Sequence, residues 1–318
     1  MMEFSWSVLA DPNTKWILMG CMLLGLMSGM IGSFAYLRKQ SLIGDTLAHA
    51  ALPGICIAFM LTGVKSLPLF FIGAFVSGLI ATYSITVITR YTRIKADAAM
   101  GIVLSVFFGI GIVLLTQIQH SPNGNQSGLD KFLFGQAASM IHSDVYLMMG
   151  VSAVIIIACT LLFKEFKLLS FDPGFARGLG FPVGLLEQLL MFFLVMTVVV
   201  GIQAVGVVLV AALLITPAVA ARYWTDRLGV MVVLSGVFGA ISGVIGTLIS
   251  TTTSNLPTGP LSVLAATTVF GFSILFAPRR GVCAKVIRRI RGNEAIRASE
   301  RMREMQRQDI RLRKEESL

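Results

Sequence analysis

Charged residues are scarce in this sequence. Asp, Glu, Lys and Arg make up 13% of its 318 residues, and the mean hydropathy is +0.82. A typical soluble domain has about 25% charged residues. The composition therefore excludes an ordinary soluble protein and indicates an integral membrane protein. We expect its first hydrophobic segment to be a retained helix, because it lacks the short apolar region and small-residue cleavage site of a signal peptide.

Paired cysteines and nucleotide-binding motifs are also lacking. The four cysteines form no CxxC pair, which argues against a disulfide framework or a zinc knuckle. No GxxxxGK[ST] motif occurs, and no connection between hydrophobic segments is long enough for a nucleotide-hydrolysing domain. We therefore expect no enzyme activity here, and any driving ATP would be hydrolysed by another polypeptide.

Long hydrophobic runs are abundant. A membrane-spanning helix needs about 20 apolar residues, and nine runs approach this length: Trp16–Tyr36, Leu42–Gly63, Leu67–Thr89, Ala98–Ile118, Val145–Phe163, Leu185–Val200, Ala204–Ala221, Val230–Ser250 and Leu261–Ala277. The sixth and seventh are interrupted only around Gly201–Gln203, so they form a tight hairpin or one of them is a short, partly inserted helix. This predicts an all-α polytopic bundle of about nine transmembrane helices over residues 16–278, after a short extracytoplasmic N-terminus (1–15).

Small residues recur within these runs at helical spacing. Two such sets are Gly25, Gly29 and Gly32, and Gly236, Gly239 and Gly243. In a membrane, small residues let helix backbones approach closely. We interpret them as packing positions.

Basic residues are unevenly distributed. The tail at 279–318 holds 13 of the 26 Lys and Arg residues but only 6 of the 16 Asp and Glu residues. With the N-terminus outside, 23 basic residues fall on the cytoplasmic side and 3 on the outer side, as the positive-inside rule requires. We expect the tail to contact the anionic inner leaflet or a partner protein rather than nucleic acid.

An aspartate and a histidine interrupt the second run, in GDTLAHAALPG (44–54). On a helix, Asp45 and His49 are four residues apart and share a face. A carboxylate with an imidazole suits Mn²⁺, Fe²⁺ or Zn²⁺, whereas oxygen ligands alone suit Ca²⁺ or Mg²⁺. Two ligands are too few for a site, so another element or a second subunit would supply the rest.

Structural interpretations of the same pair remain open. Asp45 could be a stabilising charge at a helix N-terminus, or it could pair with Arg38 or Lys39. His49 could be a buried histidine bonded to a backbone carbonyl. We also expect Pro53 and Gly54 to loosen this helix, giving a hinge or a break beside the pair.

The remaining histidines are weaker candidates. We expect His120 to lie in a solvated outer loop. His142 and Asp144 could form an outer metal contact or the N-terminal turn of a helix.

The inner connection FKEFKLLSFDPGFARGLGFPVG (163–184) is too polar to span a membrane and too apolar for a solvated linker. FDPG predicts a turn, followed by a short helix. Such a segment on the cytoplasmic face calls for a partner surface.

A family resemblance accounts for these features together. The segment RKQSLIGDTLAHAALPG (38–54) resembles the signature of the ABC-3 type permeases of bacterial manganese, zinc and iron ABC importers. The resemblance covers nearly all of residues 16–278 and continues in four blocks: ADAAMGIVLSVFFGIGIVLL (96–115), FLFGQAASMIHSDV (132–145), SFDPGFARGLGFPVGLLEQLL (170–190) and QAVGVVLVAALLITPAVAARYW (203–224).

This resemblance implies a fold like that of the type II ABC importer permeases. Two permease subunits, identical or related, would surround a central path, with cytoplasmic ABC ATPase subunits and an extracytoplasmic metal-binding protein as partners. Asp45 and His49 would form the metal site, and a dimer would bring two such pairs together. The segment at about 164–184, with Asp172, Phe175 and Arg177, would contact the ATPase.

The function implied is the membrane-spanning permease of an ATP-driven importer in the bacterial cytoplasmic membrane. It would move a divalent transition-metal ion by alternating access, Mn²⁺ first, with Zn²⁺ or Fe²⁺ as alternatives, and would hold no tightly bound cofactor. One alternative is a proton-coupled secondary transporter or channel, although the inverted repeat with paired broken helices expected of it is not evident. Another is a non-transporting membrane scaffold.

Overall fold

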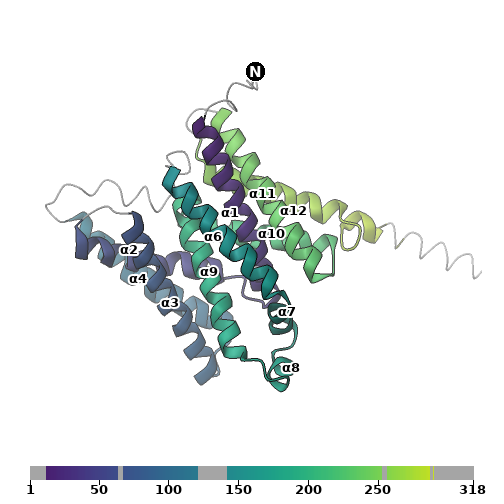
Figure 1. Cartoon of the computed structure of the whole chain (residues 1–318), viewed down its shortest axis with the longest axis horizontal. Coiled ribbons are helices and arrows are strands. Elements are labelled where there is room, and N and C mark those ends of the chain that lie inside the picture. Colours follow the sequence, from purple (N-terminus) through teal and green to yellow (C-terminus); the bar gives the residue numbers. More distant parts are fainter. Residues whose placement is uncertain (1–11, 64–66, 121–141, 253–255, 287–288, 290–318) are drawn as a thin grey trace, which may run out of the picture.

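α-Helices build the part of the chain that the structure describes, and no strand occurs among those residues (Figure 1). The computed structural model describes residues 12–63, 67–120, 142–252, 256–286 and 289. The helices are α1 (Pro12–Leu37), α2 (Ile43–Thr62), α3 (Leu67–Tyr91), α4 (Ala96–Gln119), α6 (His142–Leu161), α7 (Phe163–Phe171), α8 (Pro173–Gly178), α9 (Val183–Val205), α10 (Val207–Trp224), α11 (Leu228–Thr252) and α12 (Thr258–Phe276).

Each of the nine predicted hydrophobic runs falls on one of these helices, which confirms the all-α polytopic fold. Within the described ranges, eight helices are long and apolar enough to cross a membrane, and a shorter apolar helix occupies Leu209–Trp224. Helices suit this environment because every backbone polar group finds its partner within the segment. The predicted N-terminus (1–15) and basic tail (279–318) lie mostly outside the described residues.

The break between the sixth and seventh runs was predicted at the wrong place. Helix α9 continues through Gly201–Gln203 to Val205, and the chain turns at Gly206, whose φ of 90° favours glycine. Beyond this turn, α10 packs more extensively against α1, α11 and α12 than against α9, so the two helices do not form a close hairpin.

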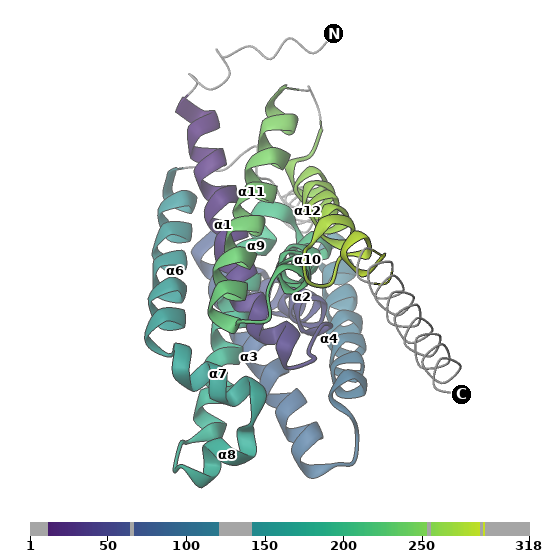
Figure 2. The same cartoon turned by 90° about the vertical axis from the view of Figure 1, so that its right-hand side faces the viewer.

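The helices fall into two groups with α9 between them (Figure 1). Helices α2, α3 and α4 pack together on one side, and α1, α10, α11 and α12 pack together on the other. Helix α9 contacts members of both groups, and its C-terminal half is almost continuously buried. The short helices α7 and α8 lie at one end of the bundle (Figure 2).

Glycines bring α1 and α11 into backbone contact, which confirms their predicted packing role. A Cβ atom at Gly25 would lie 2.1 Å from the Gly239 carbonyl oxygen, and one at Gly29 would lie 2.2 Å from that of Ser235. The Ser235 hydroxyl also donates a hydrogen bond of 2.7 Å to the Gly29 carbonyl. No larger residue fits between the two helices here.

Helix α2 does not break at Pro53, contrary to the expectation of a break. It is continuous over Ile43–Thr62. Gly54 instead allows close packing of α3, because a Cβ atom there would lie 2.0 Å from the Gly73 carbonyl oxygen.

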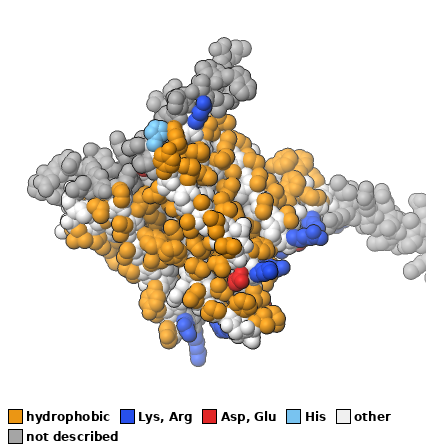
Figure 3. Space-filling view, viewed as in Figure 1, with side chains coloured by type: hydrophobic (Ala, Val, Ile, Leu, Met, Phe, Trp, Pro, Cys, Tyr) orange, Lys and Arg blue, Asp and Glu red, His pale blue; other side chains and the backbone are white. Residues whose placement is uncertain are grey.

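The surface seen in Figure 3 suits a membrane. Hydrophobic side chains cover the middle of this face, and most lysine and arginine side chains lie towards its lower end and lower right edge.

Candidate metal site

Asp45 and His49 lie on one face of α2, as their spacing predicts. His49 Nε2 is 3.4 Å from Asp45 Oδ1. The side chain of His49 is 20% exposed and that of Asp45 is 42% exposed. Both polar groups are therefore reachable from outside the protomer, and an ion could contact both at once.

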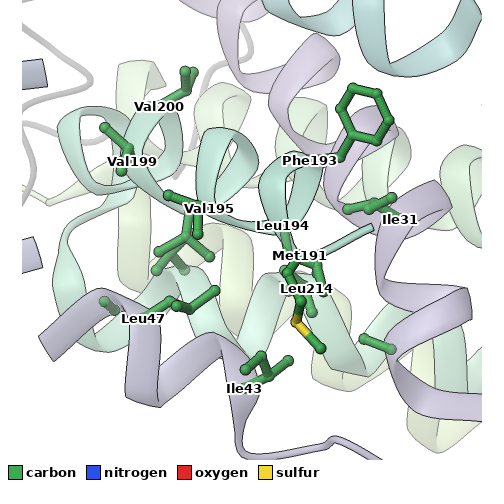
Figure 4. Packing of buried hydrophobic residues seen from close by; sticks show 14 of the residues in the cluster. Ile31, Ile43, Leu47, Met191, Phe193, Leu194, Val195, Val199, Val200 and Leu214 are labelled. Carbon is green, nitrogen blue, oxygen red and sulfur yellow. The ribbon is translucent and has the colours of Figure 1, made fainter. Parts of the chain in front are cut away.

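The opposite face of α2 fixes this outward orientation. Ile43 and Leu47 are buried on the side of α2 that meets α9 and α10 (Figure 4). A Cβ atom at Gly44 would lie 3.1 Å from Ala211 Cα, so α10 approaches the first turn of α2 closely. The Thr46 hydroxyl donates a hydrogen bond of 2.9 Å to the Leu42 carbonyl. Asp45 and His49 lie on another side of the turn from these contacts.

Helix α4 forms one wall beside the pair. The ring of Phe108 meets the His49 imidazole edge to face, with centroids 4.8 Å apart. Phe108 is itself 39% exposed. The pair therefore lies beside α4, with the partly exposed ring of Phe108 against the imidazole.

The pairing of Asp45 with Arg38 or Lys39 does not occur. Arg38 forms an ion pair with Glu187 at the start of α9 instead. Within the described ranges, no Lys or Arg nitrogen lies within 4.0 Å of Asp45. Asp45 does lie in the first turn of α2, so a favourable interaction with the helix dipole coexists with its place beside His49.

The pair alone is an incomplete metal site. Among the residues that the structure describes, no group of three or more His, Cys, Asp or Glu side chains could hold an ion. A carboxylate oxygen and an imidazole nitrogen suit Mn²⁺, Fe²⁺ or Zn²⁺, and the geometry supplies one of each. Further ligands would have to come from water, from a molecule that arrives with the ion, or from another subunit.

The other histidines do not join this site. His120 ends α4 and is exposed, with Nδ1 2.8 Å from the Thr116 carbonyl oxygen. His142 begins α6, where its ring meets the edge of Trp16 at 4.8 Å. Asp144 lies in the first turn of the same helix, so the prediction of a helix N-terminus is confirmed there.

The predicted partner segment forms α7 and α8. Asp172 caps α8, and its Oδ1 accepts a hydrogen bond of 2.8 Å from the Phe175 backbone N–H. Phe175 is 57% exposed, and Arg177 is exposed in the last turn. The exposed large apolar side chains at this end include Phe171, Leu179 and Leu185. This end of the bundle therefore presents an apolar surface with a basic residue in it.

Comparison with known proteins places the chain in a family. A model of the ABC 3 transport family matches residues 10–277. This chain belongs to the ABC 3 transport family. The match includes Asp45, His49 and the α7–α8 segment.

Similar proteins have been named in several bacteria. The manganese transport system membrane protein MntC of Bacillus subtilis (strain 168) is 56% identical over 291 residues, which are 92% of this chain and 67% of that protein. The zinc transport system membrane protein TroC of Treponema pallidum (strain Nichols) is 46% identical over 282 residues, which are 89% of this chain and 95% of that protein. The solved structure of PsaBC from Streptococcus pneumoniae in complex with Fab matches with a TM-score of 0.76 and 35% identity, covering 87% of this chain and 96% of that chain.

As a member of the ABC 3 transport family, the chain is a multi-pass membrane component of a bacterial ABC transport system. This membership favours the ABC permease over the secondary transporter and the scaffold that the sequence left as alternatives.

One feature of this family member was not predicted, namely the ion pair between Arg38 and Glu187. The residues are 149 positions apart, and the sequence placed each only near a helix end. The only available signal was a pair of opposite charges near two predicted helix ends.

Proposed function

We propose that this chain is the membrane-spanning permease of an ATP-driven importer of divalent transition-metal ions. The observation that carries the proposal is the Asp45–His49 pair, with 3.4 Å between Nε2 and Oδ1 and both groups facing outward from α2. Its ligand chemistry agrees with the manganese and zinc systems after which the relatives are named. Mn²⁺ is the first candidate ion, with Zn²⁺ and Fe²⁺ as alternatives.

A second permease subunit, identical or related, would complete the site. Two Asp–His pairs facing each other would supply two carboxylates and two imidazoles, which suffice for a divalent ion. The exposed face of α4 beside the site suits such a neighbour. Gly101, Ser105 and Gly109 follow each other at four-residue spacing along it, and a Cβ atom at either glycine would meet no described residue within 4 Å. Small residues on an open helix face permit close approach of another helix.

Other subunits would hydrolyse ATP and deliver the ion. Cytoplasmic ABC ATPases would dock on α7 and α8 through Asp172, Phe175 and Arg177 and would hydrolyse the ATP. The permease would lie in the bacterial cytoplasmic membrane. An extracytoplasmic metal-binding protein would deliver the ion to it. The permease domain would span residues 16–278, with the basic tail (279–318) at the inner leaflet.

Transport would depend on exchange of ligands rather than on covalent chemistry. The carboxylate and imidazole replace part of the water shell of the ion and must also release it. Movement driven by the ATPases would change the side of the membrane to which the site opens.

Cellular metal content tests this function. Metal-starved cells carrying wild-type chain would be compared with cells carrying Asp45→Asn or His49→Ala at equal membrane levels, with Mn, Zn and Fe measured by mass spectrometry. We expect the cellular content of one metal to fall about tenfold or more in both variants, because loss of even a hydrogen-bond partner of a metal ligand commonly lowers metal affinity by about 10–100-fold.

Matched controls come from the same chain. Asp97→Asn removes an exposed carboxylate from the first turn of α4, and His120→Ala removes an exposed imidazole from the end of the same helix. Both should leave metal content unchanged. Wild-type content of all three metals in the Asp45 and His49 variants would contradict the proposal.

A further inference from the structure

An ion pair joins two helix ends that are far apart in sequence. Arg38 Nη2 donates to Glu187 Oε1. The side chain of Arg38 is 14% exposed and that of Glu187 is 31% exposed, so the contact is mostly shielded from water. The other terminal nitrogen of Arg38, Nη1, is buried and has no hydrogen-bond partner among the residues that the structure describes. Glu187 is therefore the acceptor that holds this guanidinium.

Arg38 is held rigidly relative to Asp45. Helix α1 ends with Lys39 in the left-handed conformation at a φ of 59°, and the Gln40 N–H donates to the Ala35 carbonyl at 3.0 Å. The Ile43 N–H then donates to the Gln40 carbonyl at 3.2 Å as α2 begins. These backbone hydrogen bonds define a tight turn between Arg38 and the first turn of α2.

Glu187 is held in the same way relative to α8. The Phe181 N–H donates to the Ala176 carbonyl at 3.1 Å, with Gly180 at a φ of 83°. The Leu186 N–H donates to the Pro182 carbonyl at 3.1 Å as α9 begins. The exposed apolar surface of α8 is therefore connected to Glu187 through a second tight turn.

Apolar packing supports this contact. Ile43 and Leu47 of α2 lie beside α9, close to Met191 and Val195 (Figure 4). Such contacts tolerate sliding, whereas a charge-assisted hydrogen bond fixes two groups at one distance and direction. The ion pair is therefore the directional connection between α9 and the start of α2.

We propose that the Arg38–Glu187 pair couples displacement of α8 to the position of Asp45. Both are positioning residues, because they act on the ion only through the first turn of α2. This inference rests on the proposed function, in which α8 receives the ATPase and Asp45 meets the ion. The physical path is α8, its turn, Glu187, Arg38, the second turn and Asp45.

The complete transporter with its ATPases and delivery protein, reconstituted in proteoliposomes, tests this coupling. The measured quantity is Mn²⁺ taken up per ATP hydrolysed. The variants are Arg38→Gln, Glu187→Gln, both together, and the reversed pair Arg38→Glu with Glu187→Arg. We expect each single variant to lower the ratio about tenfold while ATP hydrolysis continues, because contacting charged residues show coupling of this order.

The two double variants separate coupling from folding. The double glutamine variant should be no worse than either single variant, and the reversed pair should recover most of the wild-type ratio. Arg280→Gln is the matched control, since Arg280 forms a cytoplasmic ion pair with Asp226 that does not involve α2 or α9. It should leave the ratio unchanged.

Three results would overturn the inference: wild-type ratios in both single variants, additive losses in the double glutamine variant, or no recovery in the reversed pair. If the single variants fail to reach the membrane, the reversed pair decides, because it restores the two opposite charges; a ratio within about threefold of wild type supports the coupling, and a loss of about tenfold contradicts it. Failure of the proposed function is recognised separately, since Asp45→Asn would then transport Mn²⁺ normally.

Discussion

Gly25 allows the close approach of α1 and α11. Its Cα faces the carbonyl of Gly239 on α11, and an added Cβ would lie 2.1 Å from that oxygen. Backbone cannot rotate away as a flexible side chain can. Helices α1 and α11 would have to separate to admit even one methyl group.

We therefore expect Gly25→Ala to destabilise the protein by about 1–3 kcal/mol, the usual cost of overpacking a core. Thermal unfolding of the purified chain in detergent measures the change. Gly150→Ala on α6 is the matched control, because within the described part of the chain a Cβ atom there meets nothing within 4 Å. Equal melting of the two variants would show that the close approach of α1 and α11 is not required for stability.

At the residue scale, the sequence predicted local pairs and missed distant ones. Asp45 and His49 are four positions apart, so the helix geometry alone brings them together. Glu187 reaches Arg38 only after α9 has packed beside α1 and α2. Its partner depends on tertiary packing, which no local pattern contains.

At the scale of elements, α4 is a helix with two different faces. One face packs against α2, where a Cβ atom at Gly111 would lie 2.8 Å from the side chain of Leu52. The other face carries Gly101 and Gly109, where an added Cβ atom would contact none of the described residues within 4 Å. A membrane lipid or another helix could cover this face, and the proposed dimer requires a helix.

We expect Gly109→Leu to reduce the fraction of complexes that contain two permease subunits by at least fivefold, because the larger side chain keeps the facing helix away. Native mass spectrometry of the solubilised transporter counts the subunits, whether identical or related. Gly150→Leu places the same side chain on an open position of α6 and should leave the count at two. A full complement of dimers in the Gly109 variant would place the second subunit on another face.

The sequence predicted the helices because each apolar run is long enough to bury its own backbone in lipid. It placed the end of α9 about five residues too early. The interruption expected around Gly201–Gln203 is buried within α9, and the chain turns only at Gly206. The backbone conformation of Gly206, with its positive φ, ends the helix there.

At the scale of the whole molecule, one carboxylate holds the chain that leaves α12. Asp226, between α10 and α11, pairs with Arg279 at 3.0 Å and with Arg280 at 2.7 Å. The hydrogen bond from Arg279 lowers the pKa of Asp226 below its ordinary value of 3.8, and the nearby charges of Arg280 and Arg222 act in the same direction. The start of the basic tail thereby pairs with the connection between α10 and α11.

Because the pKa of Asp226 is lowered, its carboxylate stays charged above pH 3.8, and its ion pairs with the arginines are lost as pH falls through the lowered pKa. A spin label on Cys283, which is exposed while Cys21, Cys56 and Cys159 are buried, would report it. We expect an ordered label from pH 7 to pH 4 and a mobile label at lower pH. Asp226→Asn should give a mobile label at every pH, and an ordered label in that variant would contradict the attachment.

The whole-molecule arrangement was predictable only in part. Which ends face the cytoplasm stays a prediction from the basic residues, and the identity of the partners stays a prediction from the family resemblance. The division into α2–α4 on one side and α1 with α10–α12 on the other depends on which small residues meet across helices. Gly54 facing Gly73 and Gly25 facing Gly239 are pairs that the sequence marks as small without marking as partners.

The backbone contact between α1 and α11 also provides a reference frame for measuring motion. No side chain lies between the helices at Gly25 and Gly29 to absorb a displacement by changing rotamer. Distance probes on α1 and α11 should therefore report the same separation in every state of a transport cycle. Probes on α2 or α9 can then be measured against that pair, so that movement of the site is distinguished from tilting of the protein in its membrane.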